Sequence, residues 1–294
     1  MRGDAMSVRL AAACALLALG SRVAPAQSAA DGGLLGARSL APDAALKVWV
    51  PEGRIRLVAW DRDSIVVRGH LARSDHFFLS GDRAGVKLGV DGAATGAGPA
   101  ELAAWIPRRA MLSVKTVGAS IDGSGVSGWF YTVSGAIHLD GAATSLEVES
   151  MAGPLDLDAT TPWLRARTGR GHLLLRGAPQ SVDASTISGT LDVAATSILR
   201  GQLGSVSGDI HWVGAPPDGA IIELSSHAGN VELLLPPAVS ADFTLSTISG
   251  VIENEFATAR RTAADPRSLR LTLGRGGAQL SVRTFRGAIR LRRR

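Results

Sequence analysis

Ser185-Thr186-Ile187-Ser188-Gly189 and Ser246-Thr247-Ile248-Ser249-Gly250 are identical stretches, and they are the clearest copies of a unit that recurs through most of the chain. The glycine that closes each copy aligns the others. The glycines in this position are Gly135, Gly153, Gly171, Gly189, Gly208, Gly229, Gly250 and Gly287. They are spaced by 18, 18, 18, 19, 21, 21 and 37 residues. Such a period is typical of a repeat architecture.

Each copy contains two short runs of alternating apolar residues, one before the glycine and one after it. The position two residues after the glycine is apolar in every copy: Ile137, Leu155, Leu173, Leu191, Ile210, Val231, Ile252 and Ile289. Such alternation predicts strands with one buried face. The inward parity changes between the two runs, so the chain must bend near the glycine, which tolerates the backbone angles that a bend needs. Because units this short leave little room for helices, we expect equivalent strands to stack in parallel about 4.8 Å apart.

A hydroxyl side chain stands three residues before the glycine in every copy. The members of this column are Thr132, Ser150, Thr168, Thr186, Ser205, Ser226, Thr247 and Thr284. The column shares parity with the apolar residue two positions earlier, so we expect it to point inward and to be hydrogen-bonded. A row of serine nucleophiles would need a base beside one of them, and no base recurs in register. The column is therefore interpreted as structural.

These patterns predict an all-β fold, a single-stranded right-handed parallel β-helix (β-solenoid) with about eight regular rungs of 18–21 residues. A β-sandwich is the alternative. We divide the chain into a signal peptide (1–26), a flexible leader (27–45), irregular strands (46–121) and regular rungs (122–294). The signal is indicated by Arg2 and Arg9, the apolar run 10–19 and the small-residue site 24–26. The single cysteine, Cys14, lies inside that run, so the mature chain has no disulfides.

The residues from Gly53 onward resemble the bacterial putative-adhesin family, whose function is unknown. The matching stretches are Gly53-Arg54-Ile55-Arg56-Leu57, Trp60-Asp61-Arg62-Asp63, the Thr-x-Ser-Gly-x-Ile/Leu units, Leu233-Leu234-Leu235-Pro236, Leu271-Thr272-Leu273-Gly274-x-Gly276-Gly277-Ala278 and Thr284-x-x-Gly287-x-Ile289-x-Leu291. The resemblance implies a β-helical domain of exported and envelope proteins, with no agreed catalytic residues to carry over. The sequence departs from the pattern at Pro154, Arg170 and Arg286, where we expect distorted rungs.

A polar column three residues after the glycine forms the most chemically interesting stripe. It contains His138, Asp156, Leu174, Asp192, His211, Glu232, Glu253 and Arg290. Because the column lies between two apolar columns, it should face outward, with neighbours about 5 Å apart. Adjacent acid–imidazole pairs or paired carboxylates could perform acid–base chemistry on a polysaccharide. The simpler interpretation is a charged face that keeps the solenoid soluble, because a fold alone does not confer an activity.

Charge is distributed unevenly along the chain. Residues 27–256 contain 17 Lys/Arg and 24 Asp/Glu, a net charge of −7, whereas residues 257–294 contain eleven arginines and one acid, a net charge of +10. Arg283, Arg286, Arg290 and Arg292 could form a cationic patch for phosphate-rich polymers or anionic headgroups. The simpler interpretation, which the sequence favours, is that they cap the open end of the solenoid, where charge resists end-to-end stacking.

Three tryptophans are candidates for binding or for the core. Trp212 occupies an inward column and is predicted to be core, whereas Trp129 and Trp163 could stack on a sugar ring or simply pack. The segment 274–277 lacks the residues of a phosphate loop and is predicted to be a turn. The segment 122–125 lacks the acidic ligands of a calcium loop. We expect no cofactor, no metal and no nucleic-acid partner.

The sequence favours an exported, non-enzymatic scaffold or adhesin-like binding module of the bacterial cell envelope, whether periplasmic, on the cell surface or secreted. The expected partners are envelope polysaccharide, an anionic polymer or another envelope protein. The alternative is a carbohydrate-active enzyme that uses the acidic stripe. The two differ in whether the stripe lies in a concave groove or on an open face.

Overall fold

The computed structural model describes residues 32–73, 75–92, 98–256 and 266–294, and every regular element in them is a β-strand. The predicted signal peptide lies outside the described residues. The strands of the N-terminal half are β1 (Gly33–Ser39), β2 (Ala45–Val50), β3 (Gly53–Trp60), β4 (Ser64–His70), β5 (His76–Gly81), β6 (Gly85–Asp91), β7 (Ala100–Pro107), β8 (Met111–Thr116), β9 (Ser120–Ser124), β10 (Ser127–Thr132), β11 (Ile137–Ala142), β12 (Leu146–Ser150) and β13 (Leu155–Thr160). Those of the C-terminal half are β14 (Trp163–Thr168), β15 (Leu173–Gly177), β16 (Ser181–Thr186), β17 (Leu191–Val193), β18 (Arg200–Ser205), β19 (Ile210–Val213), β20 (Ile221–Ser226), β21 (Val231–Leu235), β22 (Ala241–Thr247), β23 (Ile252–Asn254), β24 (Ser268–Leu273), β25 (Ala278–Thr284) and β26 (Ile289–Arg293).

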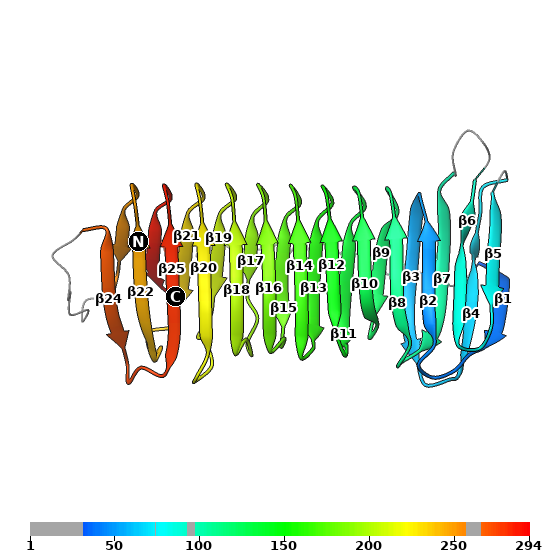
Figure 1. Cartoon of the computed structure of the whole chain (residues 1–294), viewed down its shortest axis with the longest axis horizontal. Coiled ribbons are helices and arrows are strands. Elements are labelled where there is room, and N and C mark those ends of the chain that lie inside the picture. The colour runs from blue at the N-terminus through cyan, green and yellow to red at the C-terminus, as the bar shows by residue number, and fades with distance from the viewer. Residues whose placement is uncertain (1–31, 74, 93–97, 257–265) are drawn as a thin grey trace, which may run out of the picture.

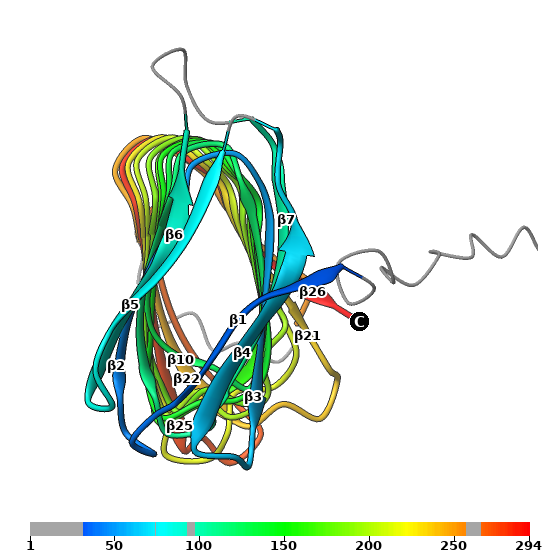
Figure 2. The same cartoon turned by 90° about the vertical axis from the view of Figure 1, so that its right-hand side faces the viewer.

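The strands form two long sheets that face each other as a flattened tube (Figures 1 and 2). Sheet A has the order β1-β4-β7-β3-β9-β11-β13-β15-β17-β19-β21-β26-β23. Sheet B has the order β24-β22-β25-β20-β18-β16-β14-β12-β10-β8-β2-β6-β5. A rung consists of one strand of sheet B followed by one strand of sheet A. The all-β, solenoid-like architecture predicted from the repeat is therefore confirmed.

Equivalent positions of successive rungs lie directly beside one another in parallel register. Leu155 pairs with Leu173, and Leu173 pairs with Leu191, so the inward apolar column becomes a buried ladder. Trp212 belongs to the same interior and is only 1% exposed, as predicted. Burial of this continuous ladder, which no single rung could achieve alone, holds the stack together.

Each bend combines three contacts that account for the Thr-x-Ser-Gly unit. The threonine oxygen accepts a hydrogen bond from the glycine N–H, at 2.9 Å between Thr186 Oγ1 and Gly189 N. The serine hydroxyl donates to the neighbouring rung, at 3.1 Å between Ser207 Oγ and Ile187 O. A Cβ on Gly189 would overlap the carbonyl oxygen of Gly171. The described glycines of this column do not have positive φ, so the expected reason for glycine was wrong: the close approach of the rungs requires it.

The three departures from the repeat do not distort their rungs, contrary to expectation. Pro154 remains in the ladder through its carbonyl, which accepts a hydrogen bond from Ile137 N–H at 3.0 Å. The amide of Arg170 donates to Met151 O at 3.1 Å, and that of Arg286 donates to His227 O at 3.0 Å. Because the bend is held mainly by backbone groups, losing the serine hydroxyl removes one side-chain bond and leaves the register intact.

Both ends of the stack are interleaved (Figure 1). At one end, the first rung (β2 and β3) lies between the β6–β7 rung and the β8–β9 rung. At the other end, the last rung (β25 and β26) lies between the β20–β21 rung and the β22–β23 rung. The C-terminal rung is thus an inner rung, and its predicted role as the cap of an open end was wrong.

Antiparallel strands cover the outer rungs. β4 pairs with β7 and β1 pairs with β4 in sheet A, while β5 pairs with β6 and β24 pairs with β22 in sheet B. Such covering strands occupy edges that could otherwise pair with another chain. The ordered fold also begins earlier than predicted, because β1 and the buried side chain of Leu40 lie within the segment interpreted as a flexible leader.

Candidate functional site

The predicted polar stripe lies on the outer face of sheet A, with its members in adjacent register. His138 pairs with Asp156, and Asp192 pairs with His211, as expected from the spacing. Leu174 separates Asp156 from Asp192. At the C-terminal end the order is Glu232, Arg290, Glu253, because β26 lies between β21 and β23. The stripe is therefore one half-exposed column along the stack.

The first carboxylate of the stripe is held by two neighbours. Arg176 Nη2 lies 2.6 Å from Asp156 Oδ1, and His138 Nδ1 lies 3.4 Å from Asp156 Oδ2. His138 Nε2 also lies 3.7 Å from an oxygen of Asp140. Arg176 and Asp140 belong to the neighbouring outward column, two residues further along each strand. Both oxygens of Asp156 are thus engaged by cationic or imidazole partners.

A carboxylate between two imidazoles forms the centre of the stripe. His211 Nδ1 lies 2.7 Å from Asp192 Oδ1, and His172 Nε2 lies 2.6 Å from Asp192 Oδ2. The repeat spacing predicted the pair of Asp192 and His211. It did not predict the contact with His172, which stands one residue after its glycine rather than three. The structure thus joins side chains from three consecutive rungs.

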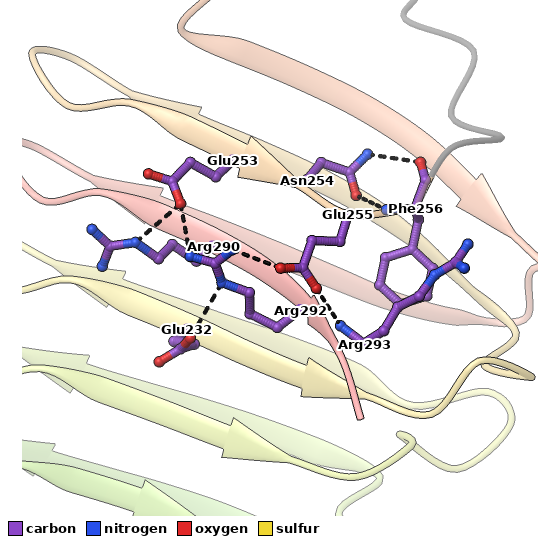
Figure 3. Close-up of polar contacts among 8 residues, drawn as sticks. All are labelled: Glu232, Glu253, Asn254, Glu255, Phe256, Arg290, Arg292 and Arg293. Atoms are coloured by element: carbon purple, nitrogen blue, oxygen red, sulfur yellow. Dashed lines mark hydrogen bonds and ion pairs between the residues drawn. The ribbon is translucent and has the colours of Figure 1, made fainter.

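The densest ion-pair cluster surrounds the inserted C-terminal strand (Figure 3). Arg292 lies 3.6 Å from Glu232, 2.9 Å from Glu253 and 2.6 Å from Glu255. Arg290 lies 3.3 Å from Glu253. This strand carries its cations between two rungs that carry the acids. The cluster therefore fastens the inserted strand to both neighbours.

The same cluster shifts two pKa values. The backbone N–H of Arg293, and then the guanidinium of Arg292, lower the pKa of Glu255 below its usual value. The hydrogen bond to Glu255 is the main reason that the pKa of Arg292 is raised. Glu255 is exposed and Arg292 is partly exposed, so these shifts represent modest surface interactions.

The four arginines proposed as one cationic patch are divided among separate partners. Arg283 lies 3.2 Å from Glu223, and Arg286 lies over the Phe285 ring at 5.6 Å. Arg290 and Arg292 belong to the cluster described above. Three of the four are thus neutralised by carboxylates, which disfavours a phosphate-binding patch at this position.

A second surface, which the sequence analysis did not single out, runs along the bends. It consists of the residue that follows the hydroxyl column, the x of Thr-x-Ser-Gly. We call it the bend ridge; its members, in the order of the rungs, are Val117, Val133, Met151, Gly169, Ile187, Val206, His227, Phe285 and Ile248. Met151 is 57% exposed, Ile187 60% and Val206 50%. The x position resembles a loop residue in one copy, and only the alignment of all copies shows that it is predominantly apolar.

A shallow hollow of about 660 Å³ lies beside the ridge on sheet B. Its lining includes Tyr131, Glu149, Arg167, Met151 and Ile187. Gly169 carries no side chain, which leaves a gap between the side chains of Met151 and Ile187; the gap is shallow, because the backbone of Met151 fills the space where a Cβ of Gly169 would lie. Two other described hollows are also lined by residues of sheet B, at the two ends of the stack. None of these three hollows is lined by the polar stripe.

The remaining candidate features have ordinary structural settings. Trp129 stacks on Tyr131 with ring centroids 5.7 Å apart, and Arg165 lies 5.4 Å over the ring of Trp163. The segment 274–277 is the predicted turn between β24 and β25, with positive φ at three glycines. Asp122 lies in strand β9 and is 3.3 Å from Arg54.

Clustered metal ligands and membrane-spanning helices are both absent from the described residues. The side chains in that part of the chain include no group of three or more His, Cys, Asp or Glu placed to share a metal ion. No helix within the same ranges has the length and apolar character to cross a bilayer.

Comparison with known proteins found no matching family model and no matching curated protein. Three crystal structures are similar. A putative adhesin from Parabacteroides merdae is 13% identical, with 89% of this chain and 97% of that chain covered and a TM-score of 0.45. A putative adhesin from Parabacteroides distasonis is 10% identical, with 88% and 98% covered and a TM-score of 0.32. A putative cell adhesion protein from Clostridium sporogenes is 9% identical, with 88% and 98% covered and a TM-score of 0.23. These names agree with the family that the sequence resembles.

Proposed function

We propose that this protein is an exported, non-enzymatic scaffold of the bacterial cell envelope, an adhesin-like module that binds its partner through the bend ridge. The ridge is carried on a right-handed solenoid of about eight regular rungs. The observation that carries the proposal is the row of exposed apolar side chains, with Met151, Ile187 and Val206 each at least half exposed. Contiguous apolar surface of this kind marks an interaction site in soluble proteins.

The contacts of the polar stripe support a structural role for it, which leaves binding to the bend ridge. Its carboxylates are bonded to side chains of neighbouring rungs, as in the contacts of Asp156 with Arg176 and of Asp192 with two histidines. An acid–base pair for glycoside cleavage needs one carboxyl group that takes up and releases a proton at the substrate. Both oxygens of Asp156 and both of Asp192 already contact side chains of this protein, which suits a role in fastening the rungs better than contact with a substrate.

The experiment compares two triple variants of the mature protein on an array of glycans, envelope polymers and envelope proteins, with the protein itself included. The ridge variant carries Met151→Ser, Ile187→Ser and Val206→Ser, and the stripe variant carries Asp156→Asn, Asp192→Asn and Glu232→Gln. The proposal predicts that the ridge variant loses the binding of the wild type while the stripe variant keeps it. Release of glycan fragments by the wild type, abolished in the stripe variant, would establish the enzyme alternative instead.

A further inference from the structure

At one point of the stack, the bend ridge and the hollow beside it have a shape and charge that could fit a second copy of the same surface. On the β12 rung, Met151 projects from the ridge and Glu149 lies beside it on sheet B. On the next rung, β14, the corresponding positions are Gly169 and Arg167. A projecting side chain and an acid thus lie next to a gap and a base, one rung apart.

A twofold axis that runs across the ridge between β12 and β14 would exploit this arrangement. In a twofold interface each residue i faces residue j of the other copy, and j faces i. With the two stacks antiparallel, Met151 enters the gap at Gly169 of the partner subunit, and Glu149 meets Arg167 of the partner subunit. The symmetry makes each of these contacts twice.

The contacts continue outward from this centre. The next rungs place Val133 opposite Ile187 of the partner subunit, and the rungs beyond them place Val117 opposite Val206 of the partner subunit. The six rungs involved span about 24 Å along the stack. Every ridge position in this span meets an apolar residue or a gap.

Other arrangements of two copies are less favourable. An axis through β14 itself would place Arg167 against Arg167 of the partner subunit and would bring Met151 against Ile187 of the partner subunit. Parallel stacks would place Met151 against itself and Arg167 near Arg170 of the partner subunit. Juxtaposed like charges oppose association, so the charges select the antiparallel register.

The two charged groups are available for this contact. Glu149 is partly exposed and has no ion-pair partner within the described part of the chain. The Arg167 side chain is 50% exposed, and its guanidinium lies 3.6 Å from Asp183, a loose contact. Each can therefore pair across an interface without first breaking a close ion pair.

We propose that the partner of the bend ridge is a second copy of this chain, docked antiparallel about the β12–β14 rungs. The inference rests on the proposed function and names the partner of the same surface. The two copies that associate ridge to ridge could come from neighbouring cells or from the same cell.

A mixing experiment tests this register. Glu149→Arg and Arg167→Glu are purified separately, and their association is measured by sedimentation velocity alongside the wild type. The wild type should self-associate, and each single variant should do so on the order of a hundredfold more weakly, because both copies then present like charges at the centre. An equimolar mixture should regain association, because the Glu149→Arg chain presents only bases at the centre and the Arg167→Glu chain presents only acids.

Three results would overturn the inference: a wild type that stays monomeric up to about 100 µM, single variants that associate like the wild type, or a mixture that stays monomeric. Thermal unfolding of each variant checks the fold. If either variant fails to fold, Met151→Asp is used in its place, and Met151→Leu serves as the matched control. A monomeric wild type whose array binding still depends on the ridge would contradict only the dimer. A ridge-dependent dimer that also releases glycan fragments through the polar stripe would contradict only the proposed function.

Discussion

The polar stripe of sheet A and the bend ridge follow the same stack of rungs, but their side chains find partners in different ways. In the column, opposite charges one rung apart reach one another, as where Asp192 lies between two histidines. In the ridge, adjacent apolar side chains such as Ile187 remain more than half exposed. Polar groups can be paired along a solenoid, whereas an outward apolar column can be covered only by another molecule. On our proposal, the polar stripe therefore holds successive rungs together, and the bend ridge contacts the partner.

Beneath the ridge, the close approach of successive glycines should give the largest effect. We expect Gly189→Ala to destabilise the protein by about 3 kcal/mol or more, because the new Cβ overlaps the Gly171 carbonyl oxygen and forces the rungs apart. Gly204→Ala is the matched control in the next rung, where a Cβ meets nothing closer than 3.8 Å. Denaturant unfolding measures both. Equal midpoints for the two variants would show that glycine is not required by the stacking.

An intermediate effect is expected at the buried hydroxyls, where threonine and serine rungs differ. Thr186→Val should cost about 1 to 3 kcal/mol, because it leaves the Gly189 N–H without its acceptor. The oxygen of Ser150 has no partner in the described residues, so Ser150→Ala should change stability by less than about 0.5 kcal/mol. β-Branching restricts χ1 of threonine, which accounts for the difference between the two residue types. Similar losses in both variants would refute this account of the column.

The smallest effect concerns the exposed ion pairs of sheet A. The pKa of Glu255 is lowered from 4.5 in the folded state, so its contribution is present above that pH and is lost as the pH falls through the folded pKa. Wild type and Glu255→Gln should therefore differ in unfolding midpoint at neutral pH and converge under more acidic conditions. High salt should also reduce the difference. A difference that grows on acidification would contradict the ion-pair role.

Much of the middle of the fold could be predicted from the sequence, because alternating apolar positions, the hydroxyl and the glycine each specify a contact with the next rung. The order of the end rungs could not. The copies closed by Gly250 and Gly287 carry equivalent columns, and either could stack on the rung of Gly229. Strand β1 was missed for a related reason: it is held by backbone pairing with β4, which leaves little trace in side-chain pattern.

The site was predicted in part. The position of the stripe on an outward face followed from its parity between two apolar columns, and its neighbour pairs followed from the rung spacing. Arg176 and His172 were missed, because they lie in adjacent columns and reach the stripe only through their side chains. The insertion of β26, which neutralises Arg290 and Arg292, depends on chain topology rather than on local sequence.

Oxidative footprinting tests most directly whether the ridge, rather than the stripe, is the contact surface. Met151 on the ridge is exposed, and so are three histidines at the stripe, two within it and His172 beside it; all four side chains react readily with hydroxyl radicals. Their oxidation would be compared between dilute purified protein and the same protein in intact cells that produce it. We predict that Met151 is protected in the cells while His138, His172 and His211 react as in the purified protein. Protected histidines with an unchanged Met151 would contradict the assignment of contact to the ridge.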